Sequence, residues 1–178
     1  MKKGLLILLS LLVVSSVFGF TQGSMLVGGT AGLSVTKSDS DDDPTTTVSI
    51  SPQLGYFVID KLAADLILSA ESQSDGDNSV AVLGIGAGGR YFFDYLYGGV
   101  DLQYRQATYD FEISDKITST AMFGTLKAGY LIPLSQRAFV DLRGSYQMGL
   151  GDYGGDSSGK NESSGLGFTA GLQVLFGN

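Results

Sequence analysis

Apolar residues alternate with polar or small residues at every second position in eight segments between Gln22 and the end of the chain. Such alternation is typical of β-strands, whose successive side chains point to opposite faces, and no segment shows the 3.6-residue period of an amphipathic helix. One face of each segment carries no charged residue. The apolar positions of this face span 25–35, 48–58, 62–70, 81–91, 96–104, 122–132, 138–148 and 166–176. The sequence therefore predicts an all-β protein with eight strands.

The opposite face of the segments is polar or small, and it carries the charges. Alternation alone does not say which face is inside, because a soluble barrel or a secreted lipocalin-like binder would turn its apolar face inward. The connections between the segments separate these alternatives. The charged members of the polar face are Asp65, Arg90, Asp101, Arg105, Lys127, Asp141 and Arg143, and its amides are Gln53, Gln103, Gln147 and Gln173.

Short and long connections alternate strictly along the chain. Three are tight, at 59–61, 92–95 and 133–136, and four are long and polar, at 37–46, 71–79, 109–118 and 151–164. Short turns at one rim and long loops at the other are the layout of outer-membrane barrels. Lipid offers no hydrogen-bond partners, so a sheet that crosses it has to close on itself. We therefore predict a closed, eight-stranded, antiparallel up-and-down transmembrane β-barrel whose charged face lines the lumen.

The first twenty residues are predicted to be a secretory signal peptide. Two lysines precede an apolar run, 4–14, which is followed by a stretch rich in small residues, 15–19. This run is well short of the roughly 20 apolar residues that a membrane-spanning helix needs, which argues against an N-terminal anchor. Cleavage is expected near 19–24, and 21–178 is the predicted barrel.

Charge and composition exclude several classes of function. The chain has 11 Lys and Arg against 18 Asp and Glu, a net charge of −7, which argues against nucleic acid as a partner. It has no Cys and no His, so thiol nucleophiles and thiolate or imidazole metal ligands are absent. Serine and aspartate without a base do not make an activated nucleophile. We expect no enzymatic activity and no cofactor.

Acidic residues gather in the four predicted long loops. Clustered carboxylates such as those at 39–43 are ligands of the kind that Ca²⁺ and Mg²⁺ prefer, but the glycine and the closing glutamate of an EF-hand loop are lacking. A solvated acidic surface is the favoured interpretation, and no metal site is assigned. The loop acids are Asp39, Asp41, Asp42, Asp43, Glu71, Asp75, Asp77, Asp110, Glu112, Asp115, Asp152, Asp156 and Glu162.

Aromatic residues are predicted to form two girdles at the membrane interfaces. The girdle near the short turns comprises Tyr56, Tyr91, Phe92, Phe93, Tyr95, Tyr97, Tyr130, Phe139 and Phe176. The girdle near the loops comprises Tyr104, Tyr109, Phe111, Tyr146 and Phe168.

Glycine and proline inside the predicted strands need separate interpretations. Gly84, Gly86 and Gly88 have the spacing of a dinucleotide-binding fingerprint, which requires a turn from a strand into a helix, and nothing helical follows them. On the lumen face, these glycines would instead make room for larger side chains of neighbouring strands. Pro52 cannot donate to a strand ladder, so a bulge is expected there.

The chain resembles the eight-stranded outer-membrane barrels related to outer membrane proteins A and X, of the "porin family" or "outer membrane β-barrel" group. The stretch SPQLGYFVIDKLAADLIL, 51–68, is similar to the strand, tight turn and strand common in that group. The last strand resembles the C-terminal signal read by the barrel-assembly machinery, which would be a transient partner, although this chain continues with Gly177 and Asn178 after the aromatic residue. The signal positions are Thr169, Gly171, Val174 and Phe176.

The charged lumen residues are expected to form a paired network, because a lone charge inside a narrow barrel would cost several kcal/mol of desolvation. An eight-stranded barrel is only just wide enough for its own side chains, so the network is expected to plug the lumen. Counting from the short turns at roughly 3.3 Å per residue places Arg90 below, and Arg105 above, the other five members. Lys127 lies on the strand next to Asp141 and Arg143.

These predictions describe a non-enzymatic barrel of the bacterial outer membrane. It would present acidic extracellular loops for envelope structure, adhesion or surface interaction. Its expected surroundings are outer-membrane lipid and lipopolysaccharide, and a monomer is expected. Two alternatives remain open at this point, a small ion-conducting channel and a secreted lipocalin-like binder of small ligands.

Overall fold

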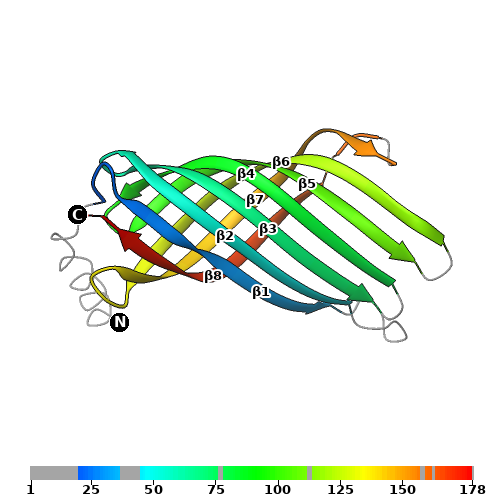
Figure 1. Ribbon diagram of the computed structural model, residues 1–178, viewed down its shortest axis with the longest axis horizontal. Helices are drawn as coiled ribbons and strands as arrows, with labels where there is room; N and C mark the ends of the chain where they lie inside the picture. Colours follow the sequence, from blue (N-terminus) through cyan, green and yellow to red (C-terminus); the bar gives the residue numbers. More distant parts are fainter. Residues whose placement is uncertain are drawn as a thin grey trace, which may run out of the picture.

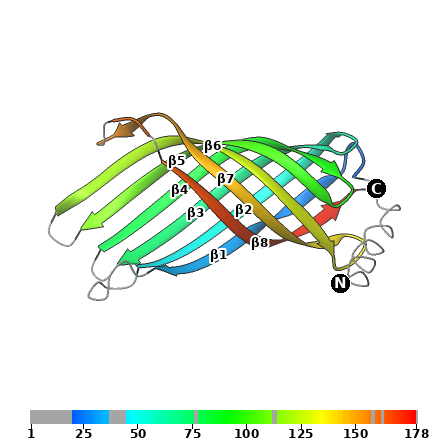
Figure 2. The same cartoon turned by 180° about the vertical axis from the view of Figure 1, so that it is seen from behind.

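A computed structural model of the protein describes residues 20–36, 45–75, 78–111, 114–156, 159–161 and 163–177. Its strands follow one another in chain order, each antiparallel to the next, and the last pairs with the first to close a barrel. Figure 1 and Figure 2 show steeply tilted strands, with the start of β1 and the end of β8 at one end. The closed eight-stranded barrel predicted from the sequence is thus confirmed. The strands are β1 Met25–Thr36, β2 Thr45–Ile59, β3 Leu62–Asp75, β4 Asn78–Phe93, β5 Leu96–Phe111, β6 Ser114–Pro133, β7 Ala138–Gly155 and β8 Ser164–Phe176.

Three tight turns close the end of the barrel where the chain enters and leaves the sheet. The turn between β2 and β3 contains Lys61 with a φ of 66°, and the turn between β4 and β5 contains Asp94 with a φ of 57°. Both residues are in the left-handed region, which lets two strands reverse over two residues. The described residues contain no helix long and apolar enough to cross a membrane.

The opposite end of the barrel has longer strands than predicted. Two of the expected long loops, 71–79 and 109–118, are largely strand, because β3 runs to Asp75 and β4 begins at Asn78, while β5 runs to Phe111 and β6 begins at Ser114. The alternation of apolar and polar residues fades there although the backbone ladder continues. Strand pairing in water needs no apolar face, so the polar sequence was wrongly interpreted as loop.

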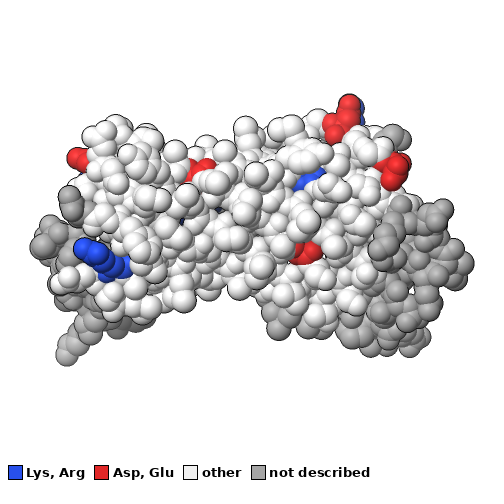
Figure 3. Space-filling model, viewed as in Figure 1, with Lys and Arg blue, Asp and Glu red and all other residues white. Residues whose placement is uncertain are grey.

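The apolar face of the sheet points outward. Leu66 and Leu102 are 48% and 55% exposed, whereas Asp101 on the alternate parity is 5% exposed. Figure 3 shows a largely uncharged side, with only a few small, separate acidic and basic patches. A secreted lipocalin-like binder would require the reverse arrangement, so that alternative is wrong.

Pro52 does not create a bulge. The register between β2 and β3 is the same before and after it, with Ile50 opposite Ala70 and Gln53 opposite Ile67, and the shift in this pair comes later, between Phe57 and Ile59. In this register Pro52 lies across from Leu68. The hydroxyl of Ser51 donates to the carbonyl oxygen of Leu68 at 3.2 Å, and so supplies a hydrogen bond beside a residue that has no amide hydrogen. This substitute donor allows proline inside a closed sheet.

Replacing Ser51 by alanine is expected to lower the free energy of unfolding by about 0.5–1.5 kcal/mol, because the carbonyl of Leu68 loses its partner. Ser51→Thr keeps a hydroxyl and should stay close to the unaltered protein. Urea titration in lipid vesicles, followed by circular dichroism, measures both. Equal losses for the two variants would contradict the role given to this hydroxyl.

The junction between β1 and β8 is the shortest pairing in the barrel. It runs only from Met25 opposite Phe176 to Ala31 opposite Ala170. Beyond it, β1 continues beside β2 as far as Thr36. Figure 1 shows the two strands diverging toward the loop end. The wall of the barrel is therefore complete in its turn half and is weakest along this junction.

Candidate functional site

A first cluster of ion pairs lies in the lumen and joins four strands. The Asp65 carboxylate accepts hydrogen bonds from Arg90 Nε at 2.8 Å and Arg90 Nη2 at 2.9 Å. Lys127 Nζ donates to Asp65 Oδ2 at 3.2 Å and to Asp101 Oδ1 at 2.6 Å. All four side chains are almost completely shielded from solvent. Two cations and two carboxylates thus neutralise each other, and the bond from Lys127 on β6 to Asp65 on β3 crosses the lumen.

A second cluster is centred on Asp141. Its carboxylate accepts hydrogen bonds from Tyr97 Oη at 2.7 Å, Arg143 Nη2 at 2.7 Å and Gln173 Nε2 at 3.2 Å. The Nη2 atom of Arg143 also donates to Gln53 Oε1 at 2.8 Å, across the lumen from β7 to β2. The two clusters together contain side chains from seven of the eight strands, all except β1. Their hydrogen bonds and ion pairs cross the lumen at this level.

Six of the seven charged residues predicted to line the lumen belong to these clusters. Arg90 was predicted to lie nearer the turns than Asp65. Its long side chain spans this difference and binds the Asp65 carboxylate directly. The ion pairs of Lys127 are with Asp65 and Asp101 rather than with Asp141 on the adjacent strand. Tyr97 is the member that the sequence analysis missed.

A cluster of buried apolar side chains, which we call the stopper, lies inside the barrel below the ion pairs, at the turn end. Phe92 is 0% exposed, and its ring lies 5.3 Å from the rings of both Phe57 and Tyr97, measured between centroids. Arg90 packs its guanidinium 5.4 Å from the ring centres of Phe92 and Tyr97, which joins the stopper to the first ion-pair cluster. The remaining members are Phe20, Leu26, Ala63, Tyr95, Leu131, Phe139 and Leu175.

The girdle predicted near the turns is wrong for four of its members, which belong to the stopper. Phe92, Tyr95, Tyr97 and Phe139 are buried inside the barrel, whereas Phe93 is 63% exposed on the outer face. The sequence could have predicted the inward direction of three of these residues. Phe92, Tyr97 and Phe139 alternate with outward apolar positions, so strand parity places them on the lumen face. Tyr95 lies in a turn, where burial raises the pKa of its hydroxyl above the usual value of 10.0, and nearby Tyr130 and Asp94 add to the shift. The members of this girdle that are exposed or half-buried are Tyr56, Tyr91, Phe93, Tyr130 and Phe176.

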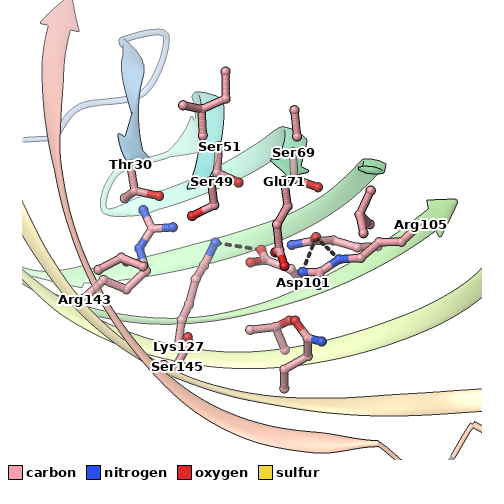
Figure 4. A pocket seen from close by; sticks show the side chains of 18 residues that line it. Thr30, Ser49, Ser51, Ser69, Glu71, Asp101, Arg105, Lys127, Arg143 and Ser145 are labelled. Atoms are coloured by element: carbon pink, nitrogen blue, oxygen red, sulfur yellow. Dashed lines mark hydrogen bonds and ion pairs between the residues drawn. The ribbon is translucent and has the colours of Figure 1, made fainter. Parts of the chain in front are cut away.

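A polar cavity of about 300 Å³ lies above the ion pairs; we call it the vestibule. Asp101, Lys127 and Arg143 form its floor, and Figure 4 shows hydroxyl groups of serine and threonine side chains around it. Polar side chains from β1, β2, β3, β5, β6, β7 and β8 contribute to the lining. The hydroxyl residues are Thr30, Ser49, Ser51, Ser69, Thr125, Ser145 and Thr169.

Arg105 lies in the vestibule, apart from the two clusters. Its Nε and Nη2 atoms donate to Gln103 Oε1 at 3.1 and 3.0 Å, and its guanidinium lies 5.0 Å from the centre of the Phe123 ring. Within the described part of the chain, no carboxylate approaches it to ion-pair distance. The prediction that Arg105 lies above the other charges is consistent with this position, but it does not join their network.

Glycines of β4 give the lumen side chains their space. A Cβ atom on Gly88 would overlap the Asp101 carboxylate, and one on Gly84 would overlap the Ser69 hydroxyl. β4 continues as a strand through these glycines to Phe93, so the geometry of a dinucleotide-binding turn is absent. The interpretation of Gly84, Gly86 and Gly88 as space for neighbouring side chains agrees with the structure.

Several solved structures share this architecture, although neither a protein-family model nor a curated protein matches the sequence. Neisserial surface protein A is 20% identical, with a TM-score of 0.57 over 86% of this chain and 96% of that one. Ail, the attachment invasion locus protein of Yersinia pestis, is 11% identical, with a TM-score of 0.56 over 88% and 100%. The outer membrane protein OprG from Pseudomonas aeruginosa is 13% identical, with a TM-score of 0.51 over 92% and 100%. The fold is that of the small outer-membrane β-barrels.

The predicted assembly signal lies on the last strand of this outer-membrane barrel fold. Val174 and Phe176 point outward, whereas Gly171 faces the lumen, where a Cβ atom would overlap the backbone of Gly29. Thr169 lines the vestibule. The packing of Gly171 against β1 explains the need for glycine at this position. Recognition by the assembly machinery stays a prediction.

The acidic cluster at 39–43 lies outside the described residues. Among the residues that the structure describes, no group of three or more acidic side chains is placed to hold a metal ion. The described acids near the loop end include Asp152 and Asp156, and Asp156 Oδ2 accepts a hydrogen bond from the amide of Thr118 at 2.9 Å. Part of the acidity at this end therefore stabilises the strand ends.

Proposed function

We propose that the protein is a non-enzymatic barrel of the bacterial outer membrane, which does not conduct ions and presents its loop end to partners outside the cell. The observation that carries this proposal is that two layers of buried side chains follow each other along the lumen, the two ion-pair clusters and the apolar stopper beneath them. Ions would have to displace both layers to pass. The vestibule above is left as a chamber on the loop side.

The outward apolar face supports the membrane location. Exposed leucines, valines and isoleucines on every strand would be unfavourable in water, whereas in lipid they meet hydrocarbon. A role in surface interaction is consistent with the name of one structural neighbour, which describes attachment and invasion. The acidic residues predicted at the loop end would give such contacts a negative surface. The sequence contains no histidine that could act as a general base and no cysteine that could act as a nucleophile.

Cell fractionation combined with protease treatment tests the location. The protein is expected in the outer-membrane fraction, to migrate as a compact band when unboiled and more slowly when boiled. Protease added to intact cells should cut only at the loop end. Recovery as a soluble periplasmic protein would overturn the proposal.

Planar-bilayer recording tests the closed lumen. The unaltered protein is expected to give no steady single-channel openings after insertion, because both closing layers are packed at this barrel diameter. Phe92→Ala and Phe93→Ala are a matched pair, since these neighbours point into the stopper and to the outside, respectively. Regular openings that grow in Phe92→Ala but not in Phe93→Ala would show a pore through the lumen, and would favour the channel alternative.

A further inference from the structure

The five residues before β1 are an integral part of the barrel. Phe20 is 4% exposed, although it precedes the first strand by several positions. Its ring centre lies 4.6 Å from that of Phe92, 5.3 Å from that of Phe57 and 6.1 Å from that of Phe139. Phe20 therefore occupies the middle of the stopper and contacts side chains from β2, β4 and β7.

Hydrogen bonds hold this segment to the end of β2 and to the turn between β2 and β3. The amide of Lys61 donates to the carbonyl oxygen of Phe20 at 2.9 Å, and the amide of Gln22 donates to Asp60 Oδ1 at 2.8 Å. The amide of Gly23 donates to the carbonyl oxygen of Phe57, also at 2.9 Å. Gly23 has a φ of 85°, which lets the chain turn from this attachment into β1. The segment from Phe20 to Ser24 is thus attached to the barrel.

We propose that the export machinery cleaves the chain between Gly19 and Phe20, so that Phe20 is the first residue of the mature protein and seals the turn end of its lumen. Signal peptidases require small, uncharged residues before the cut. Gly19 occupies the last position before this cut, and Val17 the third from last. This boundary is one residue earlier than the one predicted from the sequence, within the expected cleavage region.

Cuts further along the chain would also meet the requirement for small residues, but they would damage the barrel. Cleavage after Thr21 or after Gly23 also leaves small residues before the cut. Each would remove Phe20 and leave a cavity the size of its ring among Phe57, Phe92 and Phe139. A cut after Gly23 would also remove the donors to Asp60 and to the carbonyl of Phe57. Only a cut that precedes Phe20 keeps the packed stopper, and Val17 and Gly19 occupy the third and the last position before this cut.

N-terminal sequencing and intact mass of protein purified from the outer membrane test the cleavage site. The expected sequence begins Phe-Thr-Gln-Gly-Ser, and the expected mass is that of 20–178. A first residue at Thr21 or later, or an uncleaved chain, would overturn the proposal. This result is independent of whether the barrel conducts, so the inference and the proposed function can fail separately.

A second measurement tests the sealing role. Phe20→Ala in the full-length chain is expected to lower the temperature at which the compact gel band converts to the slow one, by several degrees. Phe93→Ala truncates the same side chain on the outer face and should shift that temperature much less. Equal shifts, or no shift in Phe20→Ala, would contradict the assignment of Phe20 to the stopper.

Discussion

Replacing Asp65 by asparagine is expected to lower the free energy of unfolding by about 3–5 kcal/mol, the usual cost of leaving a buried charge without its partner. Asp65 is the only carboxylate within ion-pair distance of Arg90 among the described residues, and it also binds Lys127. A guanidinium does not release its proton in a protein, so the charge of Arg90, which is buried inside the barrel, would remain without a partner. Urea titration of the barrel in lipid vesicles measures the loss.

Asp101→Asn is the matched control for this variant. Among the residues that the structure describes, Asp101 pairs only with Lys127, which keeps its bond to Asp65 and can also release its proton. Its loss of stability should therefore be clearly smaller. The double variant Asp65→Asn with Arg90→Gln removes both charges and should recover part of the loss. Equal effects of Asp65→Asn and Asp101→Asn would show that the first cluster does not pair as described.

Arginine in place of Leu102 is expected to cost about 2–4 kcal/mol in lipid vesicles, the range for a charge on the outer face at the middle of the bilayer. Leu102 points outward from the central part of β5, where it lies opposite Ala87 and Gly124. The cost arises because hydrocarbon cannot solvate a guanidinium. The same titration measures it.

Leu96→Arg provides the comparison on the same strand and face. Leu96 is the first residue of β5, next to the tight turn, where an arginine side chain reaches the headgroups and should cost about 0–1 kcal/mol. A gradient from Leu96 to Leu102 would confirm that lipid covers this face. Equal losses at the two positions, or none at Leu102, would contradict that orientation.

Strand parity, the alternation of inward and outward positions, predicted which charged residues lie inside the barrel. It separated Asp65, Asp101 and Lys127 from the apolar positions between them, and all three lie inside. The same parity contained the stopper, but Phe92 and Tyr97 were assigned to a girdle because they are aromatic and near a turn. In these positions, the direction set by the backbone outweighs the preference of a residue type for the interface.

The pairing of charges inside the barrel could not be predicted from distances along single strands. Counting from a turn gives relative heights for two strands joined by that turn. It does not give the offset between strands on opposite walls, which depends on the tilt and shear of the whole barrel. The contacts of Lys127 with Asp65 and of Arg143 with Gln53 are both of this kind. The bulge predicted at Pro52 was wrong for a different reason. The hydrogen bond that proline cannot donate is replaced by one from the hydroxyl of Ser51, and strand patterns do not predict such a side-chain contact.

The short junction between the first and last strands has a consequence for how the protein folds. Every other strand pair joins neighbours in sequence, which can form as local hairpins with little loss of chain entropy. Joining β1 to β8 instead brings together residues from opposite ends of the barrel sequence, such as Met25 and Phe176. This step loses more chain entropy, and the short pairing offsets it with few backbone hydrogen bonds. Ring closure is therefore expected to be the last event in folding and the first to reverse.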